Sequence, residues 1–226
     1  MDSLTHGFFS GAIDQSRIHS LHAKCLLLLK ASNFATYLSN LHEQIPDLHC
    51  LVPDNYIHTV SRKVNIDNPS LMNAELHCMP SSSDPIPFHQ DNFYHAVQGG
   101  RGFKFLIPLN KLFRLNGGLT FLDNYNSLGT LEHSPSDVPN FSAFIEANHL
   151  SRMNLSETTY SYDIGDISYH LLNSIHYSYG NTTDSMSLFV VLRYQCVNAP
   201  LCEDGLKRYE DNRVSHRHKI ARLSSS

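Results

Sequence analysis

The first part of the chain repeats apolar residues with the period of an α-helix. Between residues 15 and 45 they recur three or four positions apart, which gathers them on one face of a helix. Two amphipathic helices are predicted, the first with Ile18, Leu21, Cys25, Leu28 and Leu29 and the second with Phe34, Tyr37, Leu38 and Leu41. Asn33 is placed to cap the second helix, and Pro46 is placed to end it. We expect both helices to flank a sheet.

From Tyr56 onward the pattern changes to that of β-strands. Short runs rich in β-branched and aromatic residues alternate with clusters of Gly, Pro, Asn and Ser, as in strands joined by turns. The predicted strands are 74–79, the strand that carries His89, 103–109, 119–122, 160–164, 167–172 and 188–194, with a short helix at 141–147. This number and order indicate a mainly β protein with flanking α-helices, built as a double-stranded β-helix, the jelly-roll barrel of cupin type.

Length and composition fit one folded domain. The chain has 226 residues, of which 41% are hydrophobic and 17% charged, as is typical of a protein with a buried core. We expect a single domain over residues 1–226, with a helical part at 10–46, a barrel core at about 56–197 and a polar, basic tail at 203–226. The tail is expected to be a frayed, solvated terminus rather than an interaction arm.

Charge and cysteine content narrow the classes of partner. A formal net charge of −4 gives no overall attraction to nucleic acid or anionic membranes. The N-terminus lacks a signal-peptide pattern, and no apolar run is long enough to span a bilayer. The five cysteines are odd in number and form no Cys-x-x-Cys pair, so they indicate neither a zinc knuckle nor a full disulfide framework. We therefore expect a cytoplasmic protein that acts on a small molecule, and the pattern does not predict its oligomeric state.

The segment His89-Gln90-Asp91 carries the first candidate chemistry. Alternate side chains of an extended strand leave the same face, so His89 and Asp91 are expected to point into the barrel together while Gln90 points away. Two imidazoles and one carboxylate on one face of a metal leave its other positions open, which is the arrangement of non-haem Fe(II) oxygenases. We expect His176 to be the third ligand, so that His89, Asp91 and His176 form the metal and catalytic centre.

A longer motif surrounds His176. Gly165-Asp166 is followed by His170 and His176, and then by Gly180-Asn181-Thr182-Thr183-Asp184. This pattern resembles the phytanoyl-CoA dioxygenase family of Fe(II)/2-oxoglutarate oxygenases, whose members read Gly-Asp-x-x-x-His-x-x-x-x-x-His and then Pro/Gly-Asn-x-Ser/Thr-Asp. Asn116-Gly117 also matches the family, and the resemblance covers about residues 73–195.

The resemblance implies a reaction as well as a metal. Fe(II) would be held by His89, Asp91 and His176, with 2-oxoglutarate as co-substrate and O2 as oxidant. Decarboxylation of 2-oxoglutarate to succinate would be coupled to oxidation of a small-molecule substrate. Related halogenases have a small residue where Asp91 stands, so hydroxylation or another oxidation is implied here.

The chain differs from the family pattern at the residue that binds the C5 carboxylate of 2-oxoglutarate. Family members place an Arg eleven residues after the distal His, where it grips the C5 carboxylate, and here that position is Ser187. We expect Lys104 to replace it, as a lysine does in jumonji-type hydroxylases, with Arg193 as second choice and Arg101 as third. His170 is expected either near the co-substrate or as a core histidine.

Two alternative functions stay open from the sequence. The barrel and metal could serve an enzyme that does not use 2-oxoglutarate, or a non-catalytic metal-binding barrel. On the substrate side, residues 122–126 stand where the family usually carries Pro-Gly-Ser-His, so that side of the pocket is expected to be remodelled. Asn181 is expected to stabilise the turn after His176 rather than to bind metal.

Overall fold

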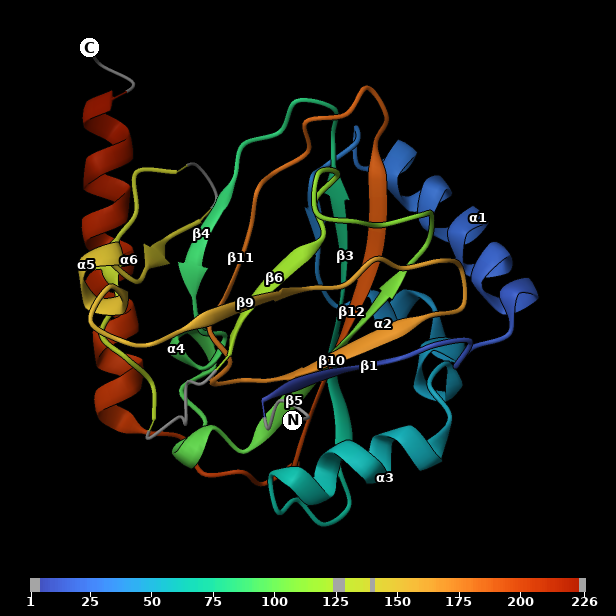
Figure 1. Cartoon of the computed structure of the whole chain (residues 1–226), viewed down its shortest axis with the longest axis horizontal. Helices are drawn as coiled ribbons and strands as arrows, with labels where there is room; N and C mark the ends of the chain where they lie inside the picture. The colour runs from blue at the N-terminus through green and yellow to red at the C-terminus, as the bar shows by residue number, and fades with distance from the viewer. Residues whose placement is uncertain (1–4, 124–128, 139–140, 224–226) are drawn as a thin grey trace.

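Two antiparallel sheets form the centre of the computed structural model, which describes residues 5–123, 129–138 and 141–223. One sheet contains β1 (His6–Phe9), β2 (Tyr37–Leu38), β3 (Ser70–Met79), β5 (Gly102–Pro108), β10 (Ile167–Leu171) and β12 (Ser187–Gln195), and the other β4 (Ile86–His89), β6 (Leu119–Asp123), β9 (Ser156–Thr159) and β11 (His176–Ser178). Their orders are β1-β10-β5-β12-β3-β2 and β4-β11-β6-β9 (Figure 1). This confirms the predicted mainly β jelly roll with flanking helices.

The side chains of β12 show how the larger sheet separates two apolar layers. Leu188, Val190 and Leu192 point to one face, and Phe189 and Val191 point to the other, because successive side chains of a strand alternate. The first face packs on the N-terminal helices. The second face belongs to the barrel interior, where it meets residues of the smaller sheet in an apolar cluster of Met79, Leu106, Leu112, Leu119, Phe121, Tyr162, Phe189 and Val191.

The N-terminal helices cover the outer face of the larger sheet. They are α1 (Gln15–Ala31), α2 (Leu41–Gln44), the 3-10 helix η1 (Pro46–Cys50) and α3 (Asp54–Lys63). The first predicted helix is confirmed as α1, whose first turn is capped by the Asp14 carboxylate accepting from the Ser16 amide at 2.8 Å. Ile18, Leu21, Cys25 and Leu29 of α1 are buried, as their spacing predicted.

The second predicted helix is largely wrong. Asn33 and Phe34 have φ of 53° and 57°, and a left-handed backbone ends a helical path. The chain continues as β2, which pairs with β3 at the edge of the larger sheet. Only the short α2 is helical in the rest of this stretch, and Pro46 begins η1 instead of ending a long helix.

Two other local predictions are corrected. The helix expected at 141–147 is instead β8 (Ala143–Phe144), paired with β7 (Ser134–Pro135), followed by α5 (Ala147–Leu150). The strand expected at 160–164 lies earlier, as β9, which has polar residues and lies at the edge of the smaller sheet. The strands predicted around 74–79, 103–109, 119–122, 167–172 and 188–194 are all confirmed, with ends that differ by a few residues.

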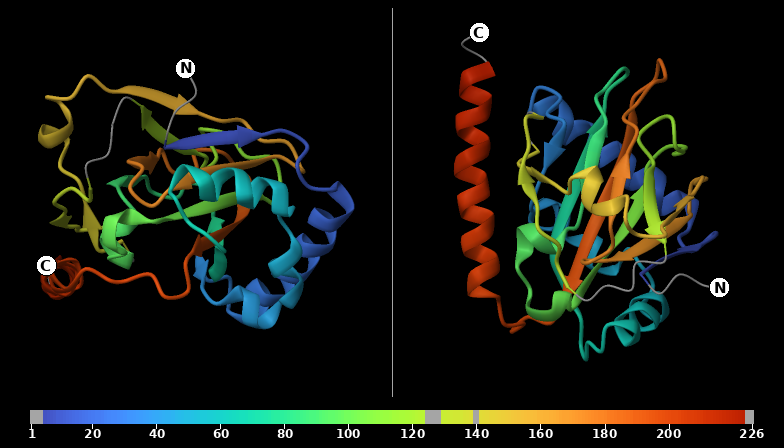
Figure 2. Two further views of the ribbon diagram at one scale, coloured as in Figure 1. Left: turned by 90° about the horizontal axis from the view of Figure 1, so that it is seen from below. Right: turned by 60° about the vertical axis from the view of Figure 1, so that its left-hand side comes forward.

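The C-terminal tail is not frayed, as the sequence had suggested. It forms α6 (Glu203–Leu223), which lies on the opposite side of the sheets from α1 and α3 (Figures 1 and 2). Buried Asn212 donates to the carbonyl of His133 at 2.8 Å, and buried His216 donates to that of Ser136 at 2.7 Å. These docking residues are polar, so the hydrophobic pattern gave no sign of them. Residues 224–226, which end the tail, lie outside the described ranges.

The helices of the described ranges also bear on membrane insertion. None of them is both long enough and apolar enough to cross a bilayer.

The sequence predicts a remodelled substrate side of the pocket at residues 122–126. Most of this segment, residues 124–126, lies outside the described residues.

Candidate metal centre

His89, Asp91 and His176 come together between the sheets. His89 ends β4 and is the cross-strand neighbour of His176 at the start of β11. The donor atoms of the three side chains all lie within 4.8 Å of one another, and each side chain is buried. Among the residues that the structure describes, this is the only such group of metal-binding side chains.

His89 and Asp91 both point toward the metal centre, as predicted, but not because they lie on one extended strand. The extended strand ends at His89, and Asp91 has helical φ and ψ of −59° and −33° at the start of α4 (Asn92–His95). The amide of Asn92 donates to the carbonyl of Leu172 at 2.8 Å, which ties this turn to the segment before His176. A tertiary contact thus helps to hold Asp91 in place, where an extended strand had been expected.

Both histidines are oriented by backbone carbonyls. The Nδ1 atom of His89 lies 2.9 Å from the carbonyl oxygen of Pro87, and Nδ1 of His176 lies 3.1 Å from that of Ser174. A carbonyl only accepts hydrogen bonds, so Nδ1 carries the proton and Nε2 keeps a free lone pair. Ligating histidines commonly have this second hydrogen bond, and the pair therefore fits a metal.

The charge states also fit a divalent cation. Burial lowers the pKa of His89 to about 4 and holds the pKa of His176 well below its ordinary value. Burial alone would raise the pKa of Asp91, but Lys104 and the neighbouring histidines outweigh it and hold that pKa well below normal. Near neutral pH the site therefore offers two neutral imidazoles and one carboxylate, which suit Fe(II) among other metals.

The Asp91 carboxylate is held by two further side chains. Lys104 donates to Oδ1 and His170 donates to Oδ2, each at 2.8 Å. The Lys104 ammonium also lies 3.5 Å from Oε2 of Glu75, so two buried carboxylates share it. This arrangement orients Asp91 and leaves Lys104 already paired.

One row of inward-facing residues crosses the larger sheet at the level of Asp91. Cross-strand pairing places His6, His170, Lys104, Arg193 and Asn73 side by side on β1, β10, β5, β12 and β3. We call this row, together with His89, Asp91, His176 and Glu75, the metal end of the barrel interior. Arg193 belongs to it and donates through Nη1 to Oε1 of Gln195 at 2.6 Å.

Ser187 lies six residues before Arg193 on β12, which is about 20 Å along a strand. It pairs with Met79, and its buried hydroxyl donates to the carbonyl of Asn116. Nearby, Asn181 donates to the carbonyls of Met79 and Ser185 at 2.9 and 2.8 Å, in the expected turn-stabilising manner. We call Ser187 and its apolar neighbours Met79, Leu119 and Phe189 the serine end. Arg101, the third choice for a cationic partner, is exposed.

Sequence reasoning missed two residues that build the site. Glu75 is buried within β3 and was not singled out, although an acidic residue in an apolar strand was a usable signal. Gln90, fully buried, donates to the carbonyl of Asn173 at 2.7 Å and accepts from the amide of Leu131 at 2.7 Å. It thereby joins the His-Gln-Asp segment to the turn that precedes His176, which no local pattern indicates.

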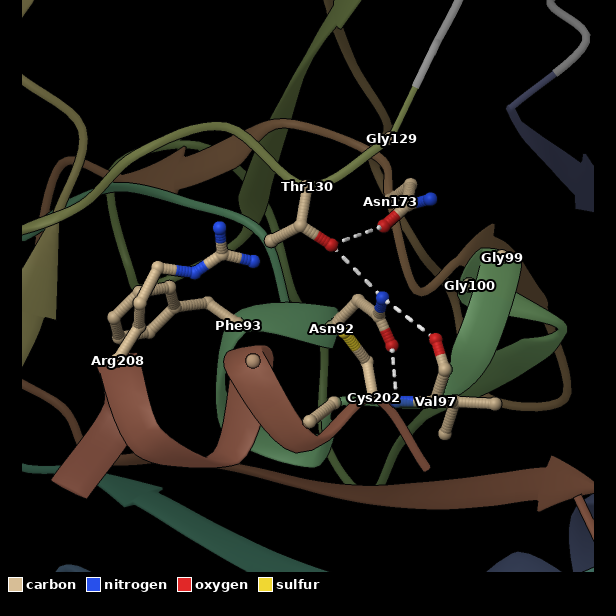
Figure 3. Close-up of a pocket in the computed structure, with 12 residues that line it drawn as sticks. Asn92, Phe93, Val97, Gly99, Gly100, Gly129, Thr130, Asn173, Cys202 and Arg208 are labelled. Atoms are coloured by element: carbon tan, nitrogen blue, oxygen red, sulfur yellow. Dashed lines mark hydrogen bonds between the residues drawn. The ribbon is translucent and has the colours of Figure 1, made fainter. Parts of the chain in front are cut away.

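A separate cavity of about 240 Å³ lies beside this turn. Asn92, Thr130 and Asn173 line one part of it, and Cys202, which precedes α6, and Arg208 of α6 line another (Figure 3). None of the three candidate ligands borders the cavity. It lies next to the metal centre without being part of it.

Comparison with known proteins gives similarity in structure but not in sequence. No protein-family model matches the chain, and no curated protein matches it in sequence. Several solved structures share its fold. The epimerase SnoN in complex with Fe3+, alpha ketoglutarate and nogalamycin RO superposes with a TM-score of 0.68 at 16% identity, over 92% of this chain and 85% of SnoN.

Two other enzymes are similar to a comparable degree. EctD from S. alaskensis with 2-oxoglutarate and 5-hydroxyectoine gives a TM-score of 0.69 at 16% identity, over 88% of this chain and 74% of EctD. The non-heme alpha ketoglutarate dependent carbocyclase SnoK gives 0.66 at 13% identity, over 90% of this chain and 86% of SnoK. At such identities the likeness establishes the jelly-roll fold that these enzymes share.

Proposed function

We propose that the protein is a non-haem Fe(II) oxygenase that couples oxidative decarboxylation of 2-oxoglutarate to oxidation of a small-molecule substrate. The observation that carries this is the His89, Asp91 and His176 group, buried inside the barrel with both histidines oriented through Nδ1. The fold shared with SnoN, EctD and SnoK supports it. The motif around His176 supports the narrower assignment to a phytanoyl-CoA dioxygenase-like group.

Each residue of the centre has a role in this proposal. His89 and His176 would hold the metal through Nε2 and Asp91 would hold it through its carboxylate, while Lys104 and His170 keep that carboxylate oriented. Bound iron, with 2-oxoglutarate and O2, would supply the oxidising chemistry, and succinate and CO2 would be the products of 2-oxoglutarate. The protein supplies a buried setting that limits access of water.

The proposal extends to substrate class and compartment. SnoN is described with nogalamycin RO and EctD with 5-hydroxyectoine, which are small molecules, and this supports a small-molecule substrate. All five cysteines are free thiols, which supports the reducing, cytoplasmic setting inferred from the sequence. The reactions of SnoN, EctD and SnoK differ, so the proposal covers oxidation in general, with hydroxylation as its simplest form.

Anaerobic titration tests the proposed function. Fe(II) is added to the metal-free protein, followed by 2-oxoglutarate, and the visible charge-transfer band of a chelated 2-oxo acid is recorded. We expect the band with wild-type protein and succinate after admission of air. Stoichiometric Fe(II) binding with neither band nor succinate would reject the use of 2-oxoglutarate.

One observation favours a second function, a metal-dependent enzyme of the same fold that does not use 2-oxoglutarate. The residue at the expected position of the carboxylate-binding Arg is Ser187, whose hydroxyl already donates to the carbonyl of Asn116 and whose cross-strand partner is the apolar Met79. A carboxylate buried there without a cation would be costly. The titration separates the two functions, and absence of Fe(II) binding would instead favour a non-catalytic barrel.

A further inference from the structure

The cavity of about 240 Å³ beside the metal centre is built from segments that are distant in the sequence. Its walls come from α4 and the loop at 97–100, from residues 129–130, from Asn173, and from Cys202 and α6 (Figure 3). Roughly 150 Å³ is enough to hold a benzene molecule. The cavity therefore has room for an aromatic ring with a small substituent.

Hydrogen bonds hold one wall of this cavity in shape. Asn92 donates from Nδ2 to Oγ1 of Thr130 at 2.8 Å, and Thr130 donates in turn to Oδ1 of Asn173 at 3.1 Å. Oδ1 of Asn92 also accepts from the amide of Val97 at 3.0 Å. Because partners fix these side chains, the wall does not collapse into the space beside it. The cavity is pre-formed, as sites for small ligands usually are.

The side-chain amide of Asn173 gives the cavity an unused donor. Its Nδ2 atom has no hydrogen-bond partner among the described residues, although Asn173 is only 8% exposed. A Cβ atom on Gly100 would lie 2.2 Å from this Nδ2 atom, so only a glycine there leaves the amide its place. A nearly buried donor without a partner is explained by a bound water or ligand.

Arg208 is the only charged residue among those that line the described walls of the cavity. Its guanidinium is exposed and takes part in no ion pair or hydrogen bond with the residues that the structure describes. Glu203 and Asp204, in the first turn of α6, are exposed and do not line the cavity. An anion in the cavity would therefore meet one unpaired cation and no carboxylate. The planar fork of a guanidinium matches a carboxylate in particular.

The rest of the lining indicates the body of the ligand. Phe93, Ala96 and Val97 are buried and apolar, and Cys202 adds a thiol of intermediate exposure. Ligand sites typically combine apolar walls with a few polar groups that fix the orientation of the ligand. One cation and one amide donor suit a singly charged carboxylate on an apolar body better than a phosphate, which carries more charge.

We propose that the cavity between α4 and α6 is a second binding site, separate from the metal centre, for a small organic monocarboxylate. Arg208 pairs with the carboxylate, Nδ2 of Asn173 donates to an oxygen of the ligand, and Phe93 and Val97 contact its apolar body. None of these residues is a candidate metal ligand. The site therefore stands independently of the proposed function.

Cys202 allows the test to be read from within the cavity. The whole chain, without added metal, is alkylated by iodoacetate or by iodoacetamide, and the rate at each cysteine is measured by peptide mass spectrometry. The two reagents are nearly equal in size, but only iodoacetate is an anion. Exposed Cys196 gives the reference ratio of the two rates in the same sample. A change in the reactivity of a thiol affects both reagents and cancels in the ratio.

We expect the ratio of the iodoacetate rate to the iodoacetamide rate at Cys202 to exceed that at Cys196 by about three- to tenfold, between the effect of an exposed ion pair and that of a charged hydrogen bond. Arg208→Gln should remove this excess. The matched control Arg62→Gln, an exposed arginine on α3, should leave it unchanged. Equal ratios at the two cysteines of wild-type protein, or an excess that persists in Arg208→Gln, would overturn the proposal.

Benzoate is the probe for binding of a carboxylate. It should slow alkylation of Cys202 by neutral iodoacetamide in wild-type protein, should do so far less in Arg208→Gln, and should not affect Cys196. Benzamide has the same ring without the charge and should protect Cys202 much less than benzoate. Equal protection by the two compounds would show an apolar cavity with no preference for anions, and protection by neither would show a cavity that holds only water. Either result overturns the proposal.

A second measurement covers the case in which Cys202 reacts with neither reagent. Binding of benzoate is then followed by saturation-transfer NMR with wild-type protein, Arg208→Gln and Arg62→Gln. A signal that is lost only in Arg208→Gln supports the site, whereas equal signals in all three proteins, or no signal in any, overturn it. None of these measurements uses Fe(II) or 2-oxoglutarate, so failure of this site leaves the proposed function standing.

Discussion

The metal end and the serine end of the barrel interior are built on the same strands but have opposite character. At the metal end, β5 contributes Lys104, which pairs with Asp91 and Glu75, and β12 contributes its cross-strand neighbour Arg193. At the serine end, β12 contributes Phe189 and Ser187 against Met79 of β3. Both ends are buried, yet nearly all of the charge is at one of them.

The difference shows where a charged co-substrate is able to bind. Burial of a carboxylate costs several kcal/mol unless a cation or several donors meet it. The metal end has an arginine with an unused donor, whereas the serine end has one hydroxyl that is already bonded. We therefore expect the metal and the co-substrate to bind together at the metal end, and the serine end to have a packing role.

The largest expected effect is loss of the metal. Replacing His89, Asp91 or His176 by Ala should abolish stoichiometric Fe(II) binding, measured by calorimetry and metal analysis, while circular dichroism shows a retained fold. His170→Ala is the matched control, because His170 contacts Asp91 but is not a ligand in this account. It should retain most of the metal, since residues that orient ligands tune affinity. Full occupancy in His176→Ala would contradict the assignment.

The second effect concerns stability of the metal end. Lys104→Met should lower the free energy of unfolding of the metal-free protein by about 3–5 kcal/mol, because it leaves two buried carboxylates without their cation. Adding Glu75→Gln to that variant should recover part of the loss. Lys24→Met, which removes an exposed ion pair with Asp47, should cost no more than about 1 kcal/mol. Equal costs for the two lysines in urea unfolding would show that the buried network is not as described.

At the serine end, a change in packing should affect stability without affecting the ligand. Phe189 stacks on His77 with ring centroids 5.0 Å apart. Phe189→Leu should cost about 1–2 kcal/mol, from the lost aromatic pair and poorer packing. The dissociation constant for 2-oxoglutarate should stay within about twofold. A much larger change in that constant would mean that the co-substrate reaches this end of the barrel.

The smallest effect is expected at Ser187 itself. Ser187→Ala removes one buried hydrogen bond to Asn116, which should lower the free energy of unfolding by about 1 kcal/mol. Affinity for 2-oxoglutarate should be unchanged, because no part of the ligand is placed there. A tenfold loss of affinity would show that the distal carboxylate binds near Ser187, at the position given by the family pattern.

The sequence predicted the parts of the site that depend on local spacing. His89, Asp91 and His176 were found from a tripeptide and a motif, and the strands of the barrel from their apolar runs. The pairing of Lys104 with Asp91 and Glu75 depends on which strands become neighbours, so no short window of sequence reveals it. A free Lys104 was therefore expected where a paired one is found.

The same limit explains the errors in the fold. Asn33 and Phe34 adopt left-handed conformations that interrupt an otherwise helical pattern, and the following residues gain hydrogen bonds by joining β3. Helix α6 docks through Asn212 and His216, whose partners are carbonyl groups about eighty residues earlier. Hydropathy reports burial of apolar side chains and does not detect docking by polar ones.

The most direct test is the position of the metal and co-substrate in crystals. Crystals grown without metal would be soaked anaerobically with Fe(II) and 2-oxoglutarate, and anomalous scattering recorded at the iron edge. We predict one strong peak bonded to Nε2 of His89, Nε2 of His176 and an oxygen of Asp91, with 2-oxoglutarate bound at the metal end. A peak elsewhere, no peak at full soak concentration, or a co-substrate extending toward Ser187 would contradict this prediction.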